Sequence, residues 1–329
     1  MTLHGIRFAG FGSYAPEKVL TNADLEKIVD TSDEWIVTRT GIRERHIAAE
    51  NEATSDLAYQ ASVRALEDAG FAAEDLDAIF VATFTPDYRM PNTACFLQEK
   101  LGAPHAACFS LEAACTGFLY SLEAAAGMMR SASYRKVLVV GAEKLTTVMD
   151  FSDRNTCVLF GDGAGAVVLE QVPAQDECLL SSTVGADGSS AHLLQVPAGG
   201  SVTPTTKEAL DKGLQFIRME GREVFKKAVN AMTGAANKVL DEAGVTADDV
   251  TWLVPHQANT RIIQGVGKKL NIPEERVFIN LDKYGNTSAA SIPLALDEMY
   301  RDGKMGKGDL ILLVAFGGGL TYGATLFRV

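Results

Sequence analysis

The chain has 329 residues, of which 47% are hydrophobic and 22% charged, and its formal net charge is −12. This length predicts two domain-sized units with a large buried core, and the acidic balance excludes a nucleic-acid partner, because phosphates require a basic surface. No apolar run approaches the roughly 20 residues of a membrane helix. The N-terminus lacks a charged region followed by an apolar one, so we expect no secretory signal.

The cysteines and the glycine-rich motifs point away from metals and bound cofactors. Five cysteines stand at positions 95, 108, 115, 157 and 178, without CxxC or CxxH spacing. Such an odd set argues against a disulfide framework and a zinc site, and predicts a reducing, cytoplasmic location. Residues 10–15 superficially mimic a dinucleotide fingerprint, but Pro16 follows at once where a helix should begin. We therefore expect neither a metal ion nor a bound cofactor.

The first half of the chain alternates strands and helices. A helix ends at Gly70, an acidic turn follows, and an apolar strand runs to Val81. Next in order are a helix over residues 92–101, a segment from Phe109 that leads into Cys115, an apolar helix over 118–129, a strand over 137–141 and a Gly-rich strand pair.

The same order recurs after the middle of the chain. A helix ends at Gly244, and an apolar strand runs to Pro255. There follow a helix over residues 259–270, a segment from Ile279 that leads into Asn286, a further helix, a strand over 310–315 and a Gly-rich strand pair. The two halves, residues 1–174 and 175–329, are therefore predicted to be a duplication joined near residues 171–178.

This order predicts an α/β fold in which each half has a mostly parallel sheet covered by helices. Two packed copies give five alternating layers, and their strand ends meet at one crevice, where open α/β sheets bind ligands. Cys115 and Asn286 then occupy nearly equivalent positions in the two copies. His256 directly follows the strand that ends at Pro255. We expect these three side chains to converge.

A cysteine, a histidine and an asparagine in this setting indicate acyl transfer through a thioester. At a helix N-terminus, the peptide dipole favours the thiolate form of Cys115, although a free cysteine is more often a small buried hydrophobe. His256 and Asn286 can donate hydrogen bonds to a developing oxyanion, whereas a plain turn is the alternative for Asn286. A glycine N–H from residues 316–323 would complete an oxyanion hole with the N–H of Cys115.

Basic residues are scarce, and some of them cluster on two predicted helices. Arg222 and Lys226 fall four apart on one helix, and Arg261, Lys268 and Lys269 fall on one face of another. A solvated helix face is the default interpretation. The alternative is a docking patch for an acidic partner, because both helices flank His256 in sequence.

Taken together, the motifs resemble the β-ketoacyl-acyl carrier protein synthase III family, condensing enzymes with a thiolase-like fold. The resemblance covers nearly the whole chain and is carried by residues 30–46, 160–165, 254–259, 285–291 and 315–319. It implies condensation of a primer acyl-CoA, acetyl-CoA by default, with malonyl-acyl carrier protein, releasing CoA and CO2 and initiating type II fatty acid synthesis. It also implies a homodimer joined through the first-half sheets.

The resemblance assigns roles to matching positions. Cys115 takes the acyl group, and His256 and Asn286 stabilise the enolate that forms when CO2 leaves. The N–H groups of Cys115 and Gly318 hold the tetrahedral oxyanion. Further implied contacts are Trp35, Arg39, Arg154 and Asn259 for CoA, Lys226 and Arg261 for docking of the acidic carrier protein, and Met90 and Phe160 for the acyl pocket.

Several departures from the family pattern leave the size of the primer acyl group open. Met90 stands where many members have an aromatic residue, Leu320 and Tyr322 replace the usual Phe and Trp, and residues 196–216 match poorly and are expected to border the acyl channel. A degradative thiolase would have a second catalytic cysteine near the C-terminal glycines, and no cysteine follows Cys178, which argues against that class of enzyme. Two alternatives remain: a specialised-metabolism ketosynthase using another acyl-CoA or malonyl-CoA, and a non-catalytic subunit that only binds acyl chains.

Overall fold

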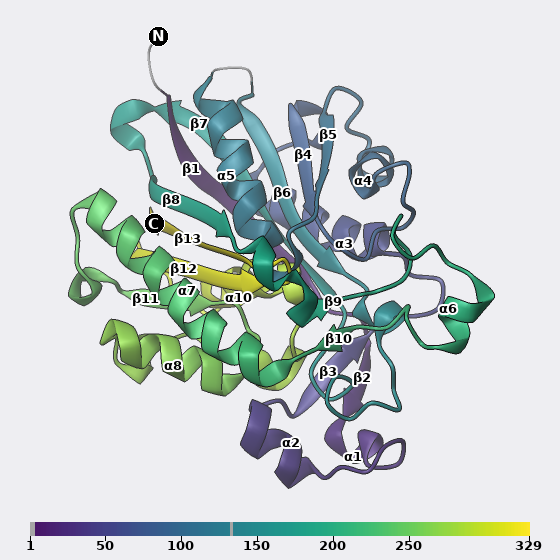
Figure 1. Cartoon of the computed structure of the whole chain (residues 1–329). Coiled ribbons are helices and arrows are strands. Elements are labelled where there is room, and N and C mark those ends of the chain that lie inside the picture. The colour runs from purple at the N-terminus through teal and green to yellow at the C-terminus, as the bar shows by residue number, and fades with distance from the viewer. Residues whose placement is uncertain (1–3, 132–133) are drawn as a thin grey trace.

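The computed structural model describes residues 4–131 and 134–329 and contains two main sheets (Figure 1). The first has the order β1 (His4–Tyr14), β7 (Gly163–Pro173), β6 (Lys136–Glu143), β4 (Ala78–Ala82) and β5 (Ala107–Leu111), in which β6, β4 and β5 run parallel. The second has the order β11 (Trp252–Pro255), β12 (Leu310–Gly317), β13 (Thr321–Arg328) and β8 (Leu179–Ala186).

The second sheet corrects the prediction of mostly parallel sheets. Only β11 and β12 are parallel there, while β12 pairs with β13 and β13 with β8 in antiparallel fashion. The reason is the length of the connections: residues 318–320 join β12 to β13, and so short a link allows only an antiparallel hairpin. Parallel neighbours need a crossover, which α8 (Thr260–Leu270) and the segment after it supply between β11 and β12.

The helices form three layers around the two sheets, which confirms the predicted five-layered, thiolase-like architecture (Figure 1). On the outer face of the first sheet lie α3 (Thr54–Ala69) and α4 (Thr93–Leu101), between the sheets α5 (Gly117–Arg130) and α10 (Ser291–Arg301), and over the second sheet α7 (Gly221–Ala243) and α8. Since α5 belongs to the first half and α10 to the second, the halves share one central layer.

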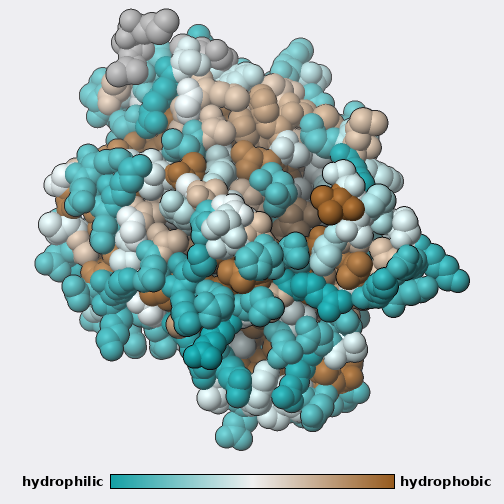
Figure 2. All heavy atoms as spheres, viewed as in Figure 1, coloured by the Kyte–Doolittle hydropathy of each residue, from teal (hydrophilic) through white to brown (hydrophobic). Residues whose placement is uncertain are grey.

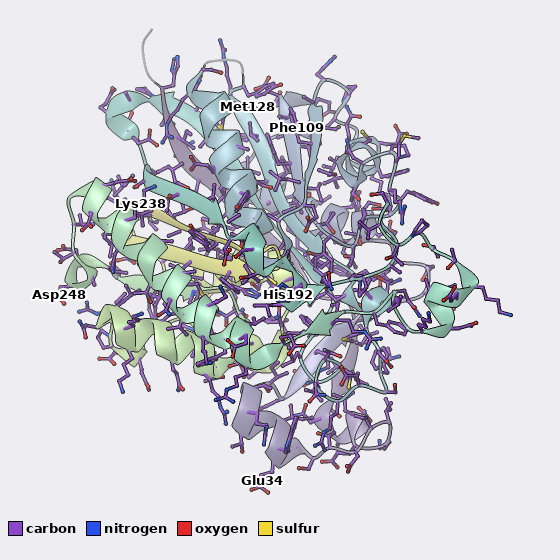
Figure 3. All side chains as sticks on the ribbon, viewed as in Figure 1. Glu34, Phe109, Met128, His192, Lys238 and Asp248 are labelled. Carbon is purple, nitrogen blue, oxygen red and sulfur yellow. The ribbon has the colours of Figure 1, made fainter. Side chains whose placement is uncertain are left out.

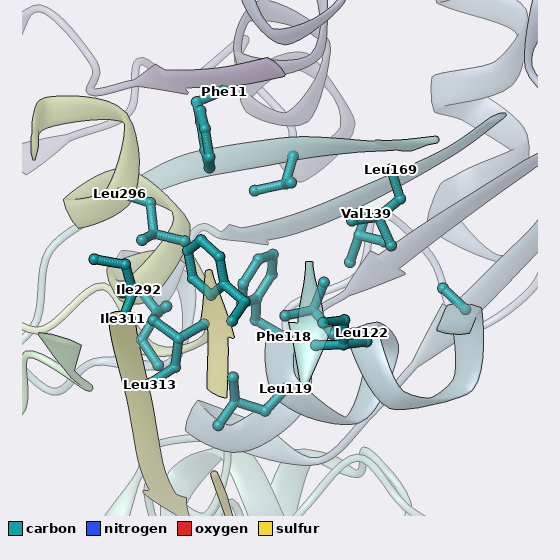
Figure 4. Packing of buried hydrophobic residues seen from close by; sticks show 14 of the residues in the cluster. Phe11, Phe118, Leu119, Leu122, Val139, Leu169, Ile292, Leu296, Ile311 and Leu313 are labelled. Carbon is teal, nitrogen blue, oxygen red and sulfur yellow. The ribbon is translucent and has the colours of Figure 1, made fainter. Parts of the chain in front are cut away.

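The central layer carries a continuous core. Phe118 from α5, Ile292 from α10 and Leu313 from β12 belong to one cluster of buried side chains, seen in Figure 4. Burying each such side chain contributes about 1.5–3 kcal/mol. This packing fixes the N-terminal ends of α5 and α10, and the chain segments that enter these helices contain Cys115 and Asn286.

Two smaller parts flank this core. One contains β2 (Lys18–Thr21), α1 (Asn22–Leu25), α2 (Asp33–Thr40) and β3 (Glu44–Ile47) (Figure 1). The other contains β9 (Leu194–Gln195), α6 (Lys207–Asp211) and β10 (Arg218–Met219). A further short helix, α9 (Leu281–Tyr284), precedes Asn286. No helix within the described ranges combines the length and the apolar character that crossing a bilayer requires.

The two turns that lead into α5 and α10 match each other, but the predicted equivalence of Cys115 and Asn286 is wrong in detail. Cys115 is the middle residue of the 3-10 turn η2 (Ala114–Thr116), whereas Asn286 lies two residues before the turn η8 (Ser288–Ala290). Each turn begins with a left-handed residue, Ala114 at φ 46° and Ser288 at φ 51°. The two residues approach each other because these turns are in contact.

Candidate active site

A cavity of about 990 Å³ lies against η2, α7, α8 and the segments that follow β11 and precede η8, and it contains the residues expected to react. Cys115, His256 and Asn286 all line it. At its outer part are exposed residues, including Arg39, Lys226 and Arg261. His192, labelled in Figure 3, is an exposed residue of the turn η5 (Gly188–Leu193) and does not line this cavity.

Cys115 is 9% exposed, at the inner end of this cavity. It precedes α5, as predicted for a residue near a helix N-terminus, but the expected stabilisation of the thiolate does not dominate. Burial raises the pKa of the thiol to about 12, and the negative charge of Glu143 also raises the pKa, whereas a hydrogen bond with Ser288 lowers it. The free site therefore holds a thiol, and acyl transfer requires an acceptor for its proton.

His256 follows β11 and is fixed from both sides. Its backbone N–H donates to the carbonyl of Val314 at 2.8 Å, and its Nδ1 lies 2.7 Å from Ser291 Oγ. The same Ser291 oxygen accepts the backbone N–H of Gln257 at 3.3 Å. With Nδ1 accepting the Ser291 hydroxyl proton, Nε2 carries the ring proton. Burial lowers the pKa of His256 to about 3, so the imidazole is a neutral hydrogen-bond donor at physiological pH.

Asn286 is oriented by its own backbone and by Ser288. Its N–H donates to Leu159 O at 2.8 Å, and its carbonyl accepts from Gly161 N at 3.1 Å. Its side-chain Oδ1 accepts the N–H of Ser288 at 2.9 Å. Because the oxygen of the carboxamide is engaged in this way, its NH2 group is the part available to donate to a ligand in the cavity.

The glycine-rich hairpin lies directly against the cysteine turn. A methyl group on Gly317 would stand 2.7 Å from the backbone nitrogen of Cys115, and one on Gly318 would stand 3.6 Å from Ala114 Cβ. Thr321 Oγ1 lies 2.9 Å from the carbonyl oxygen of Ala113, which holds the two segments together. Gly317 therefore packs against the backbone of Cys115 and Gly318 against Ala114, so the hairpin lies beside the turn that carries the cysteine.

The residues expected to bind CoA gather at the outer part of the cavity. Trp35 and Arg39 line it, and the guanidinium carbons of Arg39 and Arg154 lie 4.6 and 5.2 Å from the centre of the Trp35 ring. Arg154 itself is not a lining residue; it also donates to the carbonyl of Asp30 at 3.0 Å. A base stacked between Trp35 and Arg154 would have to displace this guanidinium.

Asn259 lines the cavity and also caps a helix. As the N-cap of α8, its Oδ1 accepts the N–H groups of Arg261 and Ile262 at 2.9 and 3.3 Å. The capping bonds occupy its oxygen, so a contact with a pantetheine arm would come from its NH2 group.

Of the two residues predicted for the acyl pocket, only Phe160 lines the cavity of this chain, and Met90 does not. Phe160 is buried, lines the cavity and forms an isolated bridge with Asn286. Met90 is 85% exposed and does not line the cavity. The expectation that residues 196–216 border the acyl channel is also corrected: only the base of that excursion, Leu194, Arg218 and Met219, lines the cavity, because β9 and β10 pair there and close it off.

Three polar residues behind the reacting groups were not predicted from the sequence: Glu143, Ser288 and Ser291. Both serines lie within the motif at residues 285–291, so the motif itself contained the signal. Glu143, an ionisable residue at the end of the apolar strand predicted at 137–141, was a weaker signal. Ser291 hydrogen-bonds His256, and Ser288 hydrogen-bonds both Asn286 and Glu143. All three residues can therefore influence the proposed reacting groups.

The fold and the similarity to known proteins place this chain in the class of thiolase-like, acyl-transferring condensing enzymes. The family models 3-oxoacyl-[acyl-carrier-protein (ACP)] synthase III and its C-terminal part match residues 109–188 and 240–329. β-Ketoacyl-[acyl-carrier-protein] synthase III of Caldanaerobacter subterraneus subsp. tengcongensis is 55% identical over 97% of this chain and 96% of that protein.

Solved structures give the same result. The crystal structure of 3-oxoacyl-[acyl-carrier-protein] synthase III from Aquifex aeolicus is 49% identical and superposes with a TM-score of 0.91 over 99% of this chain and 100% of that chain. The priming β-ketosynthase from the R1128 polyketide biosynthetic pathway is 36% identical, with a TM-score of 0.92 over 99% of this chain and 97% of that chain. The chain belongs to the β-ketoacyl-acyl carrier protein synthase III family.

Proposed function

We propose that this protein condenses a primer acyl-CoA with malonyl-acyl carrier protein through an acyl-Cys115 intermediate, the initiating step of type II fatty acid synthesis. The observation that carries this assignment is the presence of Cys115, His256 and Asn286 on one cavity, in a chain 55% identical to a synthase III. Acetyl-CoA is the default primer.

In the first step, Cys115 Sγ attacks the thioester carbonyl of the primer, and the bond from that carbon to the CoA sulfur breaks. The N–H groups of Cys115 and Gly318 stabilise the oxyanion. In the second step, malonyl-acyl carrier protein loses CO2, and the enolate oxygen accepts hydrogen bonds from His256 and Asn286. The enolate carbon then attacks the acyl carbon of the acyl-cysteine, the bond from that carbon to Cys115 Sγ breaks, and 3-oxoacyl-acyl carrier protein forms.

Neutral donors suit this second step. The negative charge on the thioester oxygen develops only as CO2 departs, so hydrogen bonds aimed at that oxygen stabilise the transition state more than the ground state. The pKa of His256, lowered by burial to about 3, keeps the ring neutral, so its Nε2–H is an uncharged donor to the enolate oxygen. Losing one such donor typically costs roughly 3–4 kcal/mol.

Charge at the mouth of the cavity supports binding of anionic substrates. Five basic residues line the cavity, Arg39, Arg218, Arg222, Lys226 and Arg261, against two acidic ones, Asp153 and Glu220. The chain as a whole carries a net charge of −12. This local excess of positive charge suits the phosphates of CoA and the acidic surface of a carrier protein, and Lys226 and Arg261 are the proposed docking residues.

A homodimer through the first sheet is part of this proposal. β5 is an edge strand of that sheet, and Tyr88 and Met90, in the segment between β4 and α4, are 64% and 85% exposed. Figure 2 shows apolar residues gathered over the part of the molecule where β4, β5 and α5 lie in Figure 1. An unpaired strand edge and exposed apolar side chains both favour association. Met90 can contribute to an acyl pocket only across such a dimer.

The test separates the two half-reactions. Incubation with acetyl-CoA is expected to add one acetyl group to Cys115, detected by intact-protein and peptide mass spectrometry. The variant His256→Ala is expected to retain this acetylation and to lose decarboxylation of malonyl-acyl carrier protein. Unchanged CO2 release by His256→Ala would contradict the role of the imidazole, and absence of acetylation in the wild type would favour a non-catalytic acyl-binding subunit.

The likeness to a priming ketosynthase of a polyketide pathway supports one second candidate, a ketosynthase of specialised metabolism. The higher identity to synthase III proteins, 55% against 36%, favours fatty acid synthesis. Acylation rates measured with acetyl-, branched and longer acyl-CoA primers distinguish the two.

A further inference from the structure

A carboxyl group without a role in the steps above is buried beside the nucleophile. Glu143, the last residue of β6, is 0% exposed. Its carboxylate accepts hydrogen bonds from the hydroxyls of Thr83 and Thr85 and from the backbone N–H groups of Phe84 and Thr85. Among the described residues no Lys or Arg forms an ion pair with it. A buried carboxylate held only by neutral donors is expensive to keep ionised, so it can readily take up a proton.

Ser288 connects this carboxylate to Cys115. Its hydroxyl donates to Glu143 Oε1 at 3.1 Å. A hydrogen bond between the Ser288 and Cys115 side chains lowers the pKa of the thiol, which places the hydroxyl beside the sulfur. A hydroxyl has one proton and two lone pairs, so Ser288 can accept from the thiol while it donates to Glu143. The backbone N–H of Ser288 donates to Asn286 Oδ1, which fixes the position of the residue. A continuous path for a proton therefore runs from sulfur to hydroxyl to carboxylate.

We propose that Glu143 accepts the proton of the Cys115 thiol through Ser288 during acylation and returns it when condensation releases the cysteine. The proposal rests on Cys115 being the acylated nucleophile. During acylation the Sγ–C bond forms, the bond from carbon to the CoA sulfur breaks, the thiol proton moves to Ser288 Oγ, and the hydroxyl proton moves to Glu143. The departing CoA thiolate takes a proton from water.

The second step reverses the path. The new C–C bond forms, the Sγ–C bond of the acyl-cysteine breaks, and the proton of Glu143 returns through Ser288 to the sulfur. In the interval Glu143 is neutral.

The basicities of the available groups favour this acceptor over the imidazole. Burial lowers the pKa of His256 to about 3, so its ring cannot hold the proton of a thiol at neutral pH. Burial raises the pKa of Glu143 to about 7, although its hydrogen bonds with Thr85, Thr83 and Ser288 lower the pKa. Of the other charged groups nearby, Glu112 only raises the pKa of the thiol, and the ammonium of Lys144 is bound to the carbonyls of Ala49 and Glu52.

Rapid-quench acylation by acetyl-CoA, followed by intact mass spectrometry across pH 5.5–9, tests the proposal. In the wild type the rate is expected to rise to a plateau as Glu143 ionises, with a midpoint near its pKa of about 7. Glu143→Gln and Ser288→Ala are expected to acylate about 100-fold more slowly at pH 7, the lower range for loss of a general base, with no plateau. Either variant alone suffices if the other fails to fold.

Thr83→Val is the matched control, because it removes a donor to Glu143 that lies outside the proton path. It is expected to keep the plateau and to move the midpoint to higher pH, since the carboxylate loses a hydrogen bond that stabilises its charge. A merely structural role for Glu143 would not predict this shift.

Decarboxylation of malonyl-acyl carrier protein is the second readout, because it needs no proton from the thiol. Glu143→Gln is expected to retain it within about 3-fold, a change of only 0.7 kcal/mol in the barrier. Acylation of Glu143→Gln at the wild-type rate and pH profile would overturn the proposal, and so would equal losses of acylation and decarboxylation. A wild-type protein that gains no acyl group on Cys115 from acetyl-, branched or longer acyl-CoA primers would instead refute the proposed function itself.

Discussion

The Nδ1 atom of His256 lies 2.7 Å from the hydroxyl oxygen of Ser291, the first residue of α10. The same oxygen accepts the N–H of Gln257, and this arrangement directs the Ser291 proton to the imidazole. A side chain on the central helix of the second half thus sets the tautomer of a residue at the end of β11. Ser291 is a positioning residue for the proposed oxyanion donor.

Replacing Ser291 with alanine removes the group that fixes the ring proton on Nε2. We expect decarboxylation of malonyl-acyl carrier protein to fall by at least about 10-fold, though by less than the roughly 10⁴-fold that a wrong tautomer costs in a catalytic triad. Acetylation of Cys115 should change by less than about 2-fold, because it does not use the imidazole donor. A parallel loss of both half-reactions would argue for a packing defect.

The pKa of His256, lowered to about 3 by burial, predicts how decarboxylation responds to pH. The ring stays neutral from pH 8 to pH 5, so CO2 release from malonyl-acyl carrier protein should show no loss of rate centred at pH 6.5, where an ordinary histidine becomes protonated. A continuous CO2 assay in buffers of constant ionic strength measures this. A decline with a midpoint near 6.5 would mean that the histidine is solvated.

Glu143 predicts a change of stability with pH. Its pKa is raised from 4.5 to about 7 in the folded protein, so between these pH values the folded state retains a proton that the unfolded state has lost. Stability contributed by the neutral carboxyl is therefore present below pH 4.5 and is lost as the pH rises through 7, by about 3 kcal/mol.

Glu143→Gln cannot titrate and should lack this loss. Urea unfolding of both proteins at pH 5 and pH 8 gives the comparison: the variant should gain stability relative to the wild type between the two pH values. An identical difference at both pH values would show that the carboxyl has the same protonation state in the folded and unfolded chains.

The contact between β6 and η8 predicts a sensitive glycine. A methyl group at Gly141 would stand 2.1 Å from the carbonyl oxygen of Ala289, so Gly141→Ala must displace the turn that carries Ser288. We expect a loss of about 1–3 kcal/mol in the free energy of unfolding, measured by denaturant titration, together with reduced acylation of Cys115.

Gly127 in α5 provides the control, because a methyl group there meets no atom within 4 Å. Gly127→Ala should be neutral or stabilising by up to about 1 kcal/mol, since alanine is the better helix former. Equal destabilisation by both substitutions would contradict the close packing of the two halves.

Docking of the carrier protein predicts a charge effect that depends on salt. Lys226→Glu at the mouth of the cavity should raise the KM for malonyl-acyl carrier protein by about 10-fold at low ionic strength, with a smaller effect at high salt. Lys268→Glu, on an exposed position of α8 outside the cavity, should change the KM by less than about 2-fold. Equal effects of the two substitutions would indicate long-range electrostatics in place of a docking site.

Much of this site could be predicted from the sequence because its residues occur in recognisable local settings. Cys115 enters a helix, His256 follows an apolar strand, and Asn286 lies in a run of small residues. The small residues after Asn286 allow close packing between the halves, since a methyl group on Gly141 would stand 2.1 Å from the carbonyl oxygen of Ala289. A local pattern shows that close approach is required; it does not show which group approaches.

The repeat in the sequence determined the duplicated order of strands and helices and the neighbourhood of the three proposed reacting residues, because hydrophobic periodicity and glycine stops act over a few residues. Only the tertiary structure decided the state of the site. Burial sets the thiol pKa of about 12 and the imidazole pKa of about 3. The path from Cys115 through Ser288 to Glu143 joins residues that are far apart in sequence, because Ser288 belongs to the second half and lies 173 positions from Cys115. Desolvation and long-range hydrogen bonds exist only once the two halves are packed together.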